Sequence, residues 1–228
     1  MDKEQQTAAI IVAAGESRRM DGMDKILVPL GGRQLMYWSL NVFQGCTLID
    51  LIVLVVNERN LERGRQLVAR QGFTKVTDVC LGGERRQDSV VEGLARIGDC
   101  EWVIIHDGAR PLVTAELIER GMEAAEDTGA AIAAVPVKDT IKVAGEDRVV
   151  RQTLPRQNLW AIQTPQVFRV DIIKEAYQRA NDDVTDDASL VEKAGGRVTL
   201  YMGSYDNIKV TTPEDLILAE ALLHKQKR

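Results

Sequence analysis

Apolar runs of strand length alternate with amphipathic segments of helical length along almost the whole chain. The runs are apolar on consecutive residues, as in strands that are buried on both faces of a parallel sheet. We expect strands at 9–13, 51–56, 76–81, 102–106, 130–135 and 198–202. Apolar residues at helical spacing predict helices at 34–43, 60–71, 88–97, 115–127, 170–179 and 189–194. The alternation therefore predicts an α/β fold, a Rossmann-like, mainly parallel sheet with helices on both faces.

The last predicted helix has the clearest start. Thr212 is placed to cap it, Pro213 takes the first helical position and Asp215 the third. We therefore expect the helix to begin at Pro213.

One stretch interrupts the alternation. Two β-rich runs, 140–144 and 148–153, surround a short loop that contains Gly145, which indicates a hairpin. It could be an edge pair of the same sheet or an arm that reaches a second subunit. Spacing favours the edge pair, because an isolated two-stranded hairpin needs something to pack on.

Composition excludes several classes of protein. The 228 residues, 45% hydrophobic and 28% charged, fit a globular chain, and we expect a single domain over 1–228. The formal net charge of −5 argues against a general nucleic-acid binder, and the apolar runs are too short to cross a membrane. Cys46, Cys80 and Cys100 form no C-x-x-C pair and are expected to be reduced core residues. The acidic and amide residues at the N-terminus are unlike a signal peptide, so we expect a cytoplasmic protein.

A turn with three cations follows the first predicted strand. It reads AAGESRRM over residues 13–20, and Lys25 lies shortly beyond. In open α/β sheets this edge binds ligands, and turn amides with arginines suit phosphate oxygens. With Gly15 as its one glycine, the loop is neither a Walker A motif nor a dinucleotide fingerprint. We predict a polyphosphate site here; the alternative is a solvated basic turn.

Further polar residues follow the third and fourth predicted strands. GGERRQDS at 82–89 is a second glycine turn with cations that opens a helix. Asp107 ends the fourth strand at the same edge, where it could handle Mg²⁺ or simply cap a turn before Pro111. His106 could be a general base, although a histidine at the end of a buried strand is more often a packing residue.

Seven motifs, in order, resemble the 2-C-methyl-D-erythritol 4-phosphate cytidylyltransferases of the non-mevalonate isoprenoid pathway, over about residues 9–222. They are AAGESRRM with Lys25, GGERRQDSV at 82–90, HDGARP at 106–111, PVKDT at 136–140, LPRQNLWAIQTPQ at 154–166, TDDAS at 185–189 and NIKVTTPEDL at 207–216. The resemblance implies a nucleotide-diphospho-sugar transferase type of fold. It also implies transfer of CMP from CTP to the phosphate of 2-C-methyl-D-erythritol 4-phosphate, with release of pyrophosphate and a requirement for Mg²⁺ or another divalent cation.

The resemblance also assigns roles to residues. Arg19 and Lys25 would stabilise the transition state at the α-phosphate, and Arg156 and Lys209 would hold the acceptor phosphate. The CTP-binding residues would be Ala13, Ala14, Gly15, Ser17, Gly83, Glu84, Arg86 and Ser89. The acceptor would be lined by Asp107, Gly108, Ala109, Arg110, Thr140, Thr164 and Thr185. Asp107 would also bind the metal, directly or through water. Ser17 stands where the family often has glycine. The serine restricts the turn to φ values that residues other than glycine can adopt.

The family forms homodimers, so the resemblance implies that an inserted arm at about 138–164 reaches the partner's site. Thr140 and Arg156 would then act across the interface. Three alternatives remain: a cytidylyltransferase for ribitol 5-phosphate, one for the molybdenum cofactor, and a non-catalytic nucleotide-binding regulator. The four presumed catalytic cations argue against the regulator.

Overall fold

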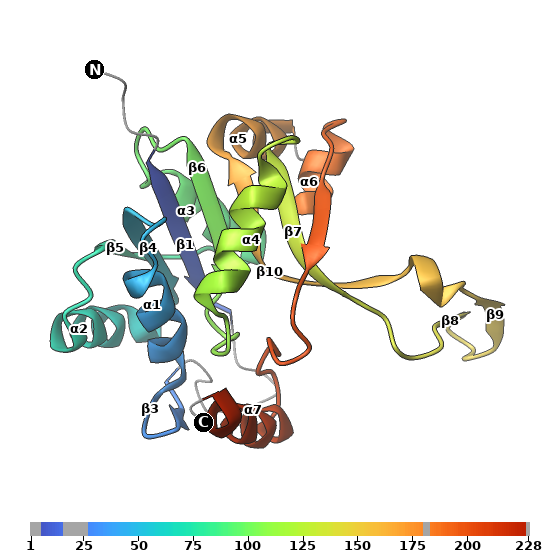
Figure 1. Ribbon diagram of the computed structural model, residues 1–228, viewed down its shortest axis with the longest axis horizontal. Helices are drawn as coiled ribbons and strands as arrows, with labels where there is room; N and C mark the ends of the chain where they lie inside the picture. Colours follow the sequence, from blue (N-terminus) through green and yellow to red (C-terminus); the bar gives the residue numbers. More distant parts are fainter. Residues whose placement is uncertain (1–5, 16–26, 180–182, 227–228) are drawn as a thin grey trace.

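A single mixed sheet organises the part of the chain that the computed structural model describes, residues 6–15, 27–179 and 183–226. Its seven strands run in the order β11-β7-β10-β6-β1-β4-β5 (Figure 1). Their bounds are β1 Thr7–Ala13, β4 Leu51–Val56, β5 Val76–Leu81, β6 Trp102–Asp107, β7 Ala130–Pro136, β10 Trp160–Arg169 and β11 Thr199–Met202. All six predicted strands are present, and the mainly parallel sheet is confirmed.

The strand that sequence analysis missed is β10, which pairs antiparallel with both β6 and β7. It contains Pro165 and the buried polar residues Gln163, Thr164 and Gln166, so it lacks a continuous apolar run. Tertiary partners satisfy these polar groups: Gln163 Nε2 donates to the carbonyl of Ser204 at 2.9 Å, for example. A strand of this kind is recognisable only when its neighbours are known.

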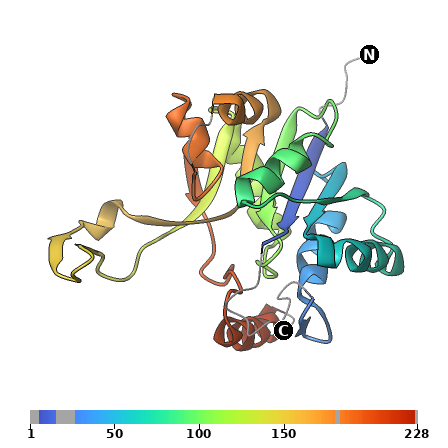
Figure 2. The same ribbon diagram turned by 180° about the vertical axis from the view of Figure 1, so that it is seen from behind.

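Helices cover both faces of the sheet. Helices α1 (Leu35–Gly45) and α4 (Ala115–Ala125) lie in front of it in Figure 1, with α2 (Leu61–Gln71) after a 3₁₀ turn at Glu58–Asn60. The opposite face carries α5 (Val170–Arg179), α6 (Ala188–Lys193) and α3 (Arg86–Leu94), the last in front of the sheet in Figure 2. Alternation along β1 divides the core: Ile11 packs on the α1 side and Ile10 on the α3 side. Both helical layers predicted from the sequence are confirmed.

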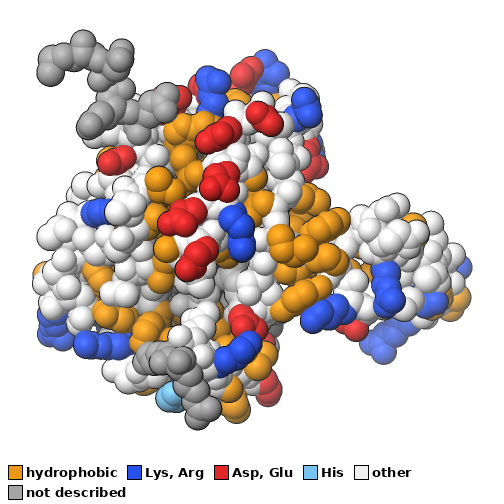
Figure 3. Space-filling view, viewed as in Figure 1, with side chains coloured by type: hydrophobic (Ala, Val, Ile, Leu, Met, Phe, Trp, Pro, Cys, Tyr) orange, Lys and Arg blue, Asp and Glu red, His pale blue; other side chains and the backbone are white. Residues whose placement is uncertain are grey.

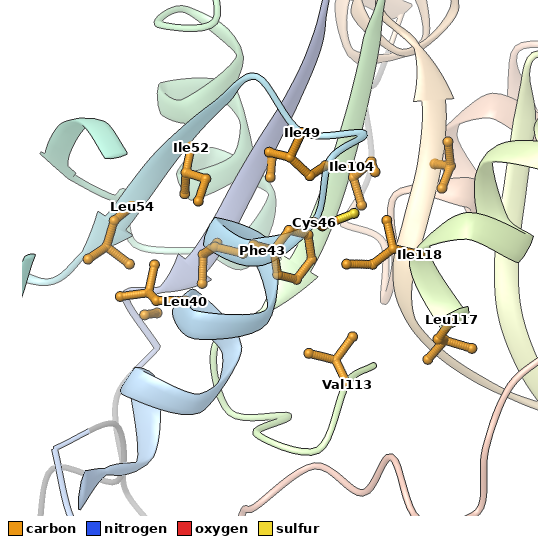
Figure 4. Close-up of a cluster of buried hydrophobic side chains, with 14 of the residues drawn as sticks. Leu40, Phe43, Cys46, Ile49, Ile52, Leu54, Ile104, Val113, Leu117 and Ile118 are labelled. Carbon is orange, nitrogen blue, oxygen red and sulfur yellow. The ribbon is translucent and has the colours of Figure 1, made fainter. Parts of the chain in front are cut away.

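Phe43 of α1 is at the centre of the first of these cores. Figure 4 shows its ring among Cys46, Ile49 and Ile104. Full burial of such a side chain contributes about 2–3 kcal/mol to stability. Cys46, Cys80 and Cys100 are all buried free thiols, as expected from the sequence.

A smaller third core lies beneath the carboxyl edge of the sheet. There α7 (Pro213–Gln226) packs Ala219 and Leu223 against Leu30 of the short ribbon β2 (Pro29–Leu30) and β3 (Arg33–Gln34). The helix starts where predicted: Asp215 N donates to Thr212 Oγ1 at 3.3 Å, and Thr212 N donates back to Asp215 Oδ2 at 2.9 Å. Among the described residues, no helix is long and apolar enough to span a bilayer.

The predicted hairpin forms, but the expected edge pair is wrong. Strands β8 (Lys142–Ala144) and β9 (Val150–Thr153) pair only with each other, in an arm that projects from the body (Figures 1 and 3). The edge beside β7 is already filled by β11, so the hairpin has no free strand there to join. The insertion is also shorter than 138–164, because β10 begins at Trp160, paired with Pro136. We call residues 137–159 the arm.

Candidate functional site

A hollow opens at the carboxyl edge of the sheet, where β1, β5 and β6 end. We call it the first hollow. Residues from four separate segments line it: Val12, Ala13, Ala14, Gly15, Gly83, Glu84, Arg85, Arg86, Ser89, Asp107, Ala109 and Lys209. The structure therefore brings together most of the residues that sequence analysis grouped around a nucleotide. Ser17, Arg19 and Lys25 lie outside the described residues.

Glycine lets two of these loops touch. A Cβ atom built on Gly82 would lie 2.6 Å from the Cβ of Ala14, closer than real Cβ atoms approach. The second loop then enters α3, where Asp88 Oδ2 accepts from the backbone N–H of Arg85 at 3.1 Å. The loop thereby holds the start of α3, and with it Arg86 and Ser89, against the end of β1.

Asp107 is a buried carboxylate between cations. Its Oδ1 accepts from Arg86 Nε at 3.0 Å and its Oδ2 from Lys209 Nζ at 2.7 Å. Burial alone would raise the pKa of Asp107, but the charges of Arg86 and Lys209 more than offset this and hold the pKa below its usual range. The carboxylate is therefore ionised at neutral pH and is fixed in orientation from both sides.

Arg86 is itself held by a second carboxylate. Its Nη1 donates to Asp187 Oδ2 at 2.8 Å, and the hydroxyl of Tyr177 donates to Asp187 Oδ1 at 2.6 Å. Burial lowers the pKa of Arg86, and the charges of Asp187 and Asp107 outweigh that effect and raise it. Sequence analysis did not select Asp187, although it lies in the TDDAS motif beside Thr185; that motif was the available signal.

A second hollow adjoins the first and shares three residues with it, Arg86, Asp107 and Lys209. We call it the second hollow. It is lined in addition by Arg110, Ile132, Ile162, Gln163, Thr164, Gln166, Thr185, Asp186, Ser189, Glu192 and Leu200. Of these, Arg110, Thr164 and Thr185 were predicted as acceptor-binding residues, whereas Gln163, Gln166, Asp186 and Ser189 were not. Ligands in the two hollows would meet at the three shared residues.

Arg110 lines the second hollow and carries a buried donor without a partner. Its Nη1 donates to the carbonyl of Asn207 at 2.7 Å, but its buried Nε has no hydrogen-bond partner. The nearest carboxylate oxygen, Asp107 Oδ2, lies 3.9 Å from Nε, too far for a hydrogen bond. Burial lowers the pKa of Arg110. A buried donor left unsatisfied is costly, so this part of the Arg110 side chain is held at some cost to stability.

Four more predicted residues lie elsewhere or act differently. Gly108 lines neither hollow; its N–H donates to the carbonyl of Val12 at 2.8 Å. Thr140 and Arg156 are exposed at the arm and line neither hollow of their own chain, and Arg156 Nη1 donates to the carbonyl of Lys138 at 2.7 Å. His106 is fully buried, and burial lowers its pKa to about 4.

Comparison with known proteins identifies the family. A family model described as 2-C-methyl-D-erythritol 4-phosphate cytidylyltransferase matches residues 7–225. A protein of that name from Dehalococcoides mccartyi is 52% identical over 221 residues, which cover 97% of this chain and 97% of the relative. Another from Geobacillus kaustophilus is 49% identical over 219 residues, which cover 94% of this chain and 96% of the relative. The crystal structure of 4-diphosphocytidyl-2C-methyl-D-erythritol synthase from Anaerococcus prevotii aligns with a TM-score of 0.85 at 31% identity, covering 96% of each chain. The chain therefore belongs to the 2-C-methyl-D-erythritol 4-phosphate cytidylyltransferases, the nucleotidyltransferases of non-mevalonate isoprenoid biosynthesis.

Proposed function

We propose that the two hollows bind CTP and 2-C-methyl-D-erythritol 4-phosphate and join them at Asp107, Arg86 and Lys209. An oxygen of the acceptor phosphate attacks the α-phosphorus of CTP. The bond from that phosphorus to the bridging oxygen breaks, and pyrophosphate leaves with the electron pair. The observation that carries the proposal is the meeting of two adjoining hollows at one carboxylate and two cations. Such chemistry depends on positioning and charge neutralisation, and it needs no activated side-chain nucleophile.

The first hollow suits the nucleotide. Its wall of Ala13, Ala14 and Gly83 lets backbone groups approach a base closely, and Ser89 adds a hydroxyl near the start of α3. Backbone acceptors there could recognise the exocyclic amine of cytosine, which uracil lacks. The remaining residues proposed to bind CTP are Gly15, Ser17, Glu84 and Arg86. Ser17, together with the proposed catalytic residues Arg19 and Lys25, remains a sequence prediction.

The second hollow suits the acceptor. Arg110 brings a guanidinium group to its wall, and Lys209, 37% exposed in its side chain, can move from Asp107 toward a phosphate. We assign Thr164 and Thr185, which line this hollow, to the acceptor as well; Gly108 and Ala109 do not line it and stay sequence predictions for the acceptor. Thr164 shapes the wall of the hollow and does not bind the acceptor through its hydroxyl. That hydroxyl already accepts from Asp107 N at 3.0 Å and hydrogen-bonds the His106 ring.

The residues also fit a divalent cation held mainly by the substrates. The described residues contain no group of three potential ligands, and Asp107 is the carboxylate that faces both hollows near Lys209. Mg²⁺ is commonly bound by one or two carboxylates together with substrate phosphates. Asp107 would hold it, directly or through water, and the ion would neutralise charge on the triphosphate.

We further propose that two chains form a homodimer in which the arm completes the partner's site. The arm exposes Val149 and Val150 by 52% and 53%, and a two-stranded ribbon is marginally stable alone. Thr140 and Arg156 have no hollow to serve within their own chain. A cation from a partner's arm would supply the second charge needed to hold the acceptor phosphate.

Pyrophosphate release from CTP and Mg²⁺ tests the activity. We expect release with 2-C-methyl-D-erythritol 4-phosphate and none with ribitol 5-phosphate. Lys209→Ala should lower the rate of release by roughly two orders of magnitude, while Lys174→Ala, a lysine of α5 that lines neither hollow, should leave it unchanged. Pyrophosphate release only with ribitol 5-phosphate would show that the acceptor is wrongly assigned. No release with either acceptor would overturn the proposal.

A further inference from the structure

The turn that follows β6 is fastened at both ends by one imidazole. His106 precedes the turn, Asp107 opens it and Arg110 closes it. Because side chains alternate along a strand, the His106 ring points away from the carboxylate of Asp107, toward α1, where its centroid lies 5.2 Å from that of Phe43. His106 therefore lines neither hollow, although Asp107 lines both and Arg110 lines the second.

The hydrogen bonds of His106 define a single arrangement of protons. Nε2 lies 3.1 Å from the carbonyl oxygen of Arg110, and a carbonyl can only accept, so Nε2 carries the proton. In a neutral ring Nδ1 is then an acceptor, and the Thr164 hydroxyl, 3.1 Å away, donates to it. Thr164 Oγ1 in turn accepts from the backbone N–H of Asp107 at 3.0 Å. The ring thus connects the two ends of the turn through a continuous chain of hydrogen bonds.

We propose that His106 is a positioning residue for acceptor binding: its Nε2–H imidazole, through Thr164 and the Arg110 carbonyl, sets where the Asp107 and Arg110 side chains lie in the second hollow. The Arg110 carbonyl also accepts from Ser39 Oγ at 3.1 Å, so the Arg110 end is held twice. At the Asp107 end, by contrast, the Thr164 hydroxyl that accepts from Asp107 N donates its own proton to Nδ1 of His106. The Thr164 link is therefore the part that depends most on the imidazole.

The first test needs no substrate. The chain has two histidines, His106 and His224, and His224→Asn assigns their signals in a ¹⁵N-detected imidazole spectrum. At pH 7 we expect His106 to show an unprotonated Nδ1 and a protonated Nε2. A protonated Nδ1, or protons on both nitrogens, would overturn the proposal. Because this result does not depend on turnover, it stands whether or not the proposed reaction is correct.

The second test rests on the proposed function and divides the two hydrogen bonds. In His106→Asn the side-chain oxygen replaces Nδ1 as acceptor for Thr164; in His106→Gln the amide nitrogen replaces Nε2 as donor to Arg110; His106→Leu removes both. We expect KM for the acceptor to rise about tenfold in the leucine and glutamine variants and less in the asparagine variant. The dissociation constant of CMP, which the proposed function places in the first hollow, should change less than twofold.

The controls separate positioning from folding. The exposed His224→Asn should behave as wild type in both measurements. Rescue by asparagine, at equal melting temperature to the leucine variant, is a result that a purely structural histidine would not produce. Equal losses of acceptor and CMP binding in all three His106 variants, or an unchanged acceptor KM in His106→Leu, would overturn the proposal.

Discussion

Lys209 Nζ lies 2.7 Å from Asp107 Oδ2, which joins residues that are 102 positions apart in the sequence. The same carboxylate is held from its other oxygen by Arg86 at 3.0 Å. The two cations differ in their surroundings: the side chain of Lys209 is 37% exposed, whereas Arg86 is clamped between two buried carboxylates. This difference predicts that Lys209 contributes mainly to catalysis and Arg86 mainly to the stability of the fold.

Lys209→Ala should lower kcat by roughly two orders of magnitude, because removing one charge that stabilises a transition state costs about 2–4 kcal/mol. The free energy of unfolding should change by less than about 1 kcal/mol, since Lys209 is partly exposed and Asp107 keeps Arg86. Arg86→Ala should instead lose about 3–5 kcal/mol of stability, because it leaves the buried carboxylate of Asp187 without its cation and Asp107 with Lys209 alone. Steady-state kinetics and urea unfolding measure the two effects. Equal stability losses in both variants would contradict this division.

Mixing two inactive variants should restore activity if the arm serves the partner's site. Arg156→Ala removes the arm cation and Lys209→Ala removes the body cation, so each homodimer lacks one charge at every site. A heterodimer has one complete site, and random mixing predicts about a quarter of wild-type activity. Pyrophosphate release after refolding an equimolar mixture measures it. A mixture no more active than its separate components would show that each chain uses its own arm.

Stability should fall between pH 6.5 and pH 4 because of His106. Burial lowers the pKa of this ring to about 4 from 6.5, so in that interval the unfolded chain binds more protons than the folded one. The neutral ring's contribution is complete above pH 6.5 and is lost as the pH falls, on the order of 3 kcal/mol in total. Asp107, whose pKa is lowered from 3.8, has its effect in a lower range of pH. We would measure the free energy of unfolding in urea at several pH values. Between pH 6.5 and pH 4 it should fall less steeply with pH in His106→Asn than in wild type. An identical pH dependence in the two proteins would contradict this assignment.

Tyr177→Phe should lower the free energy of unfolding, because it removes a hydrogen bond from Asp187, the carboxylate that holds Arg86. The phenol donates to Asp187 Oδ1 at 2.6 Å, and burial followed by the Asp187 charge raises the pKa of Tyr177. Loss of a hydrogen bond to a buried carboxylate costs about 1–3 kcal/mol in urea unfolding. Tyr37→Phe is the matched control, because its hydroxyl donates to Asn41 at 3.2 Å in an exposed bond; we expect it to stay within about 0.5 kcal/mol of wild type. Similar losses in both variants would contradict a special role for the Asp187 bond.

The polar residues of the site divide into those that a local pattern revealed and those that it did not. Gly83, Arg86 and Asp107 lie in turns that follow predicted strands, so the rule that ligands gather at the carboxyl edge of a parallel sheet pointed to these turns, and the family resemblance then assigned the individual residues. Lys209 lies between two β-branched residues and has the pattern of an exposed position; only the family resemblance selected it. Asp187 was missed because nothing local distinguishes it from Asp186.

Local periodicity in the sequence was enough to determine the six parallel-type strands, the helices between them and the start of α7 at Pro213, because burial on both faces and helix capping depend on neighbouring residues. The tertiary structure alone decided the place of β10, whose buried polar groups depend on partners such as Ser204, and the projection of β8 and β9. It also decided the pairing of Asp107 with Lys209 and the hydrogen bonds of His106 to Arg110 and Thr164. These features are set by contacts between residues far apart in the chain, and no spacing rule contains that information.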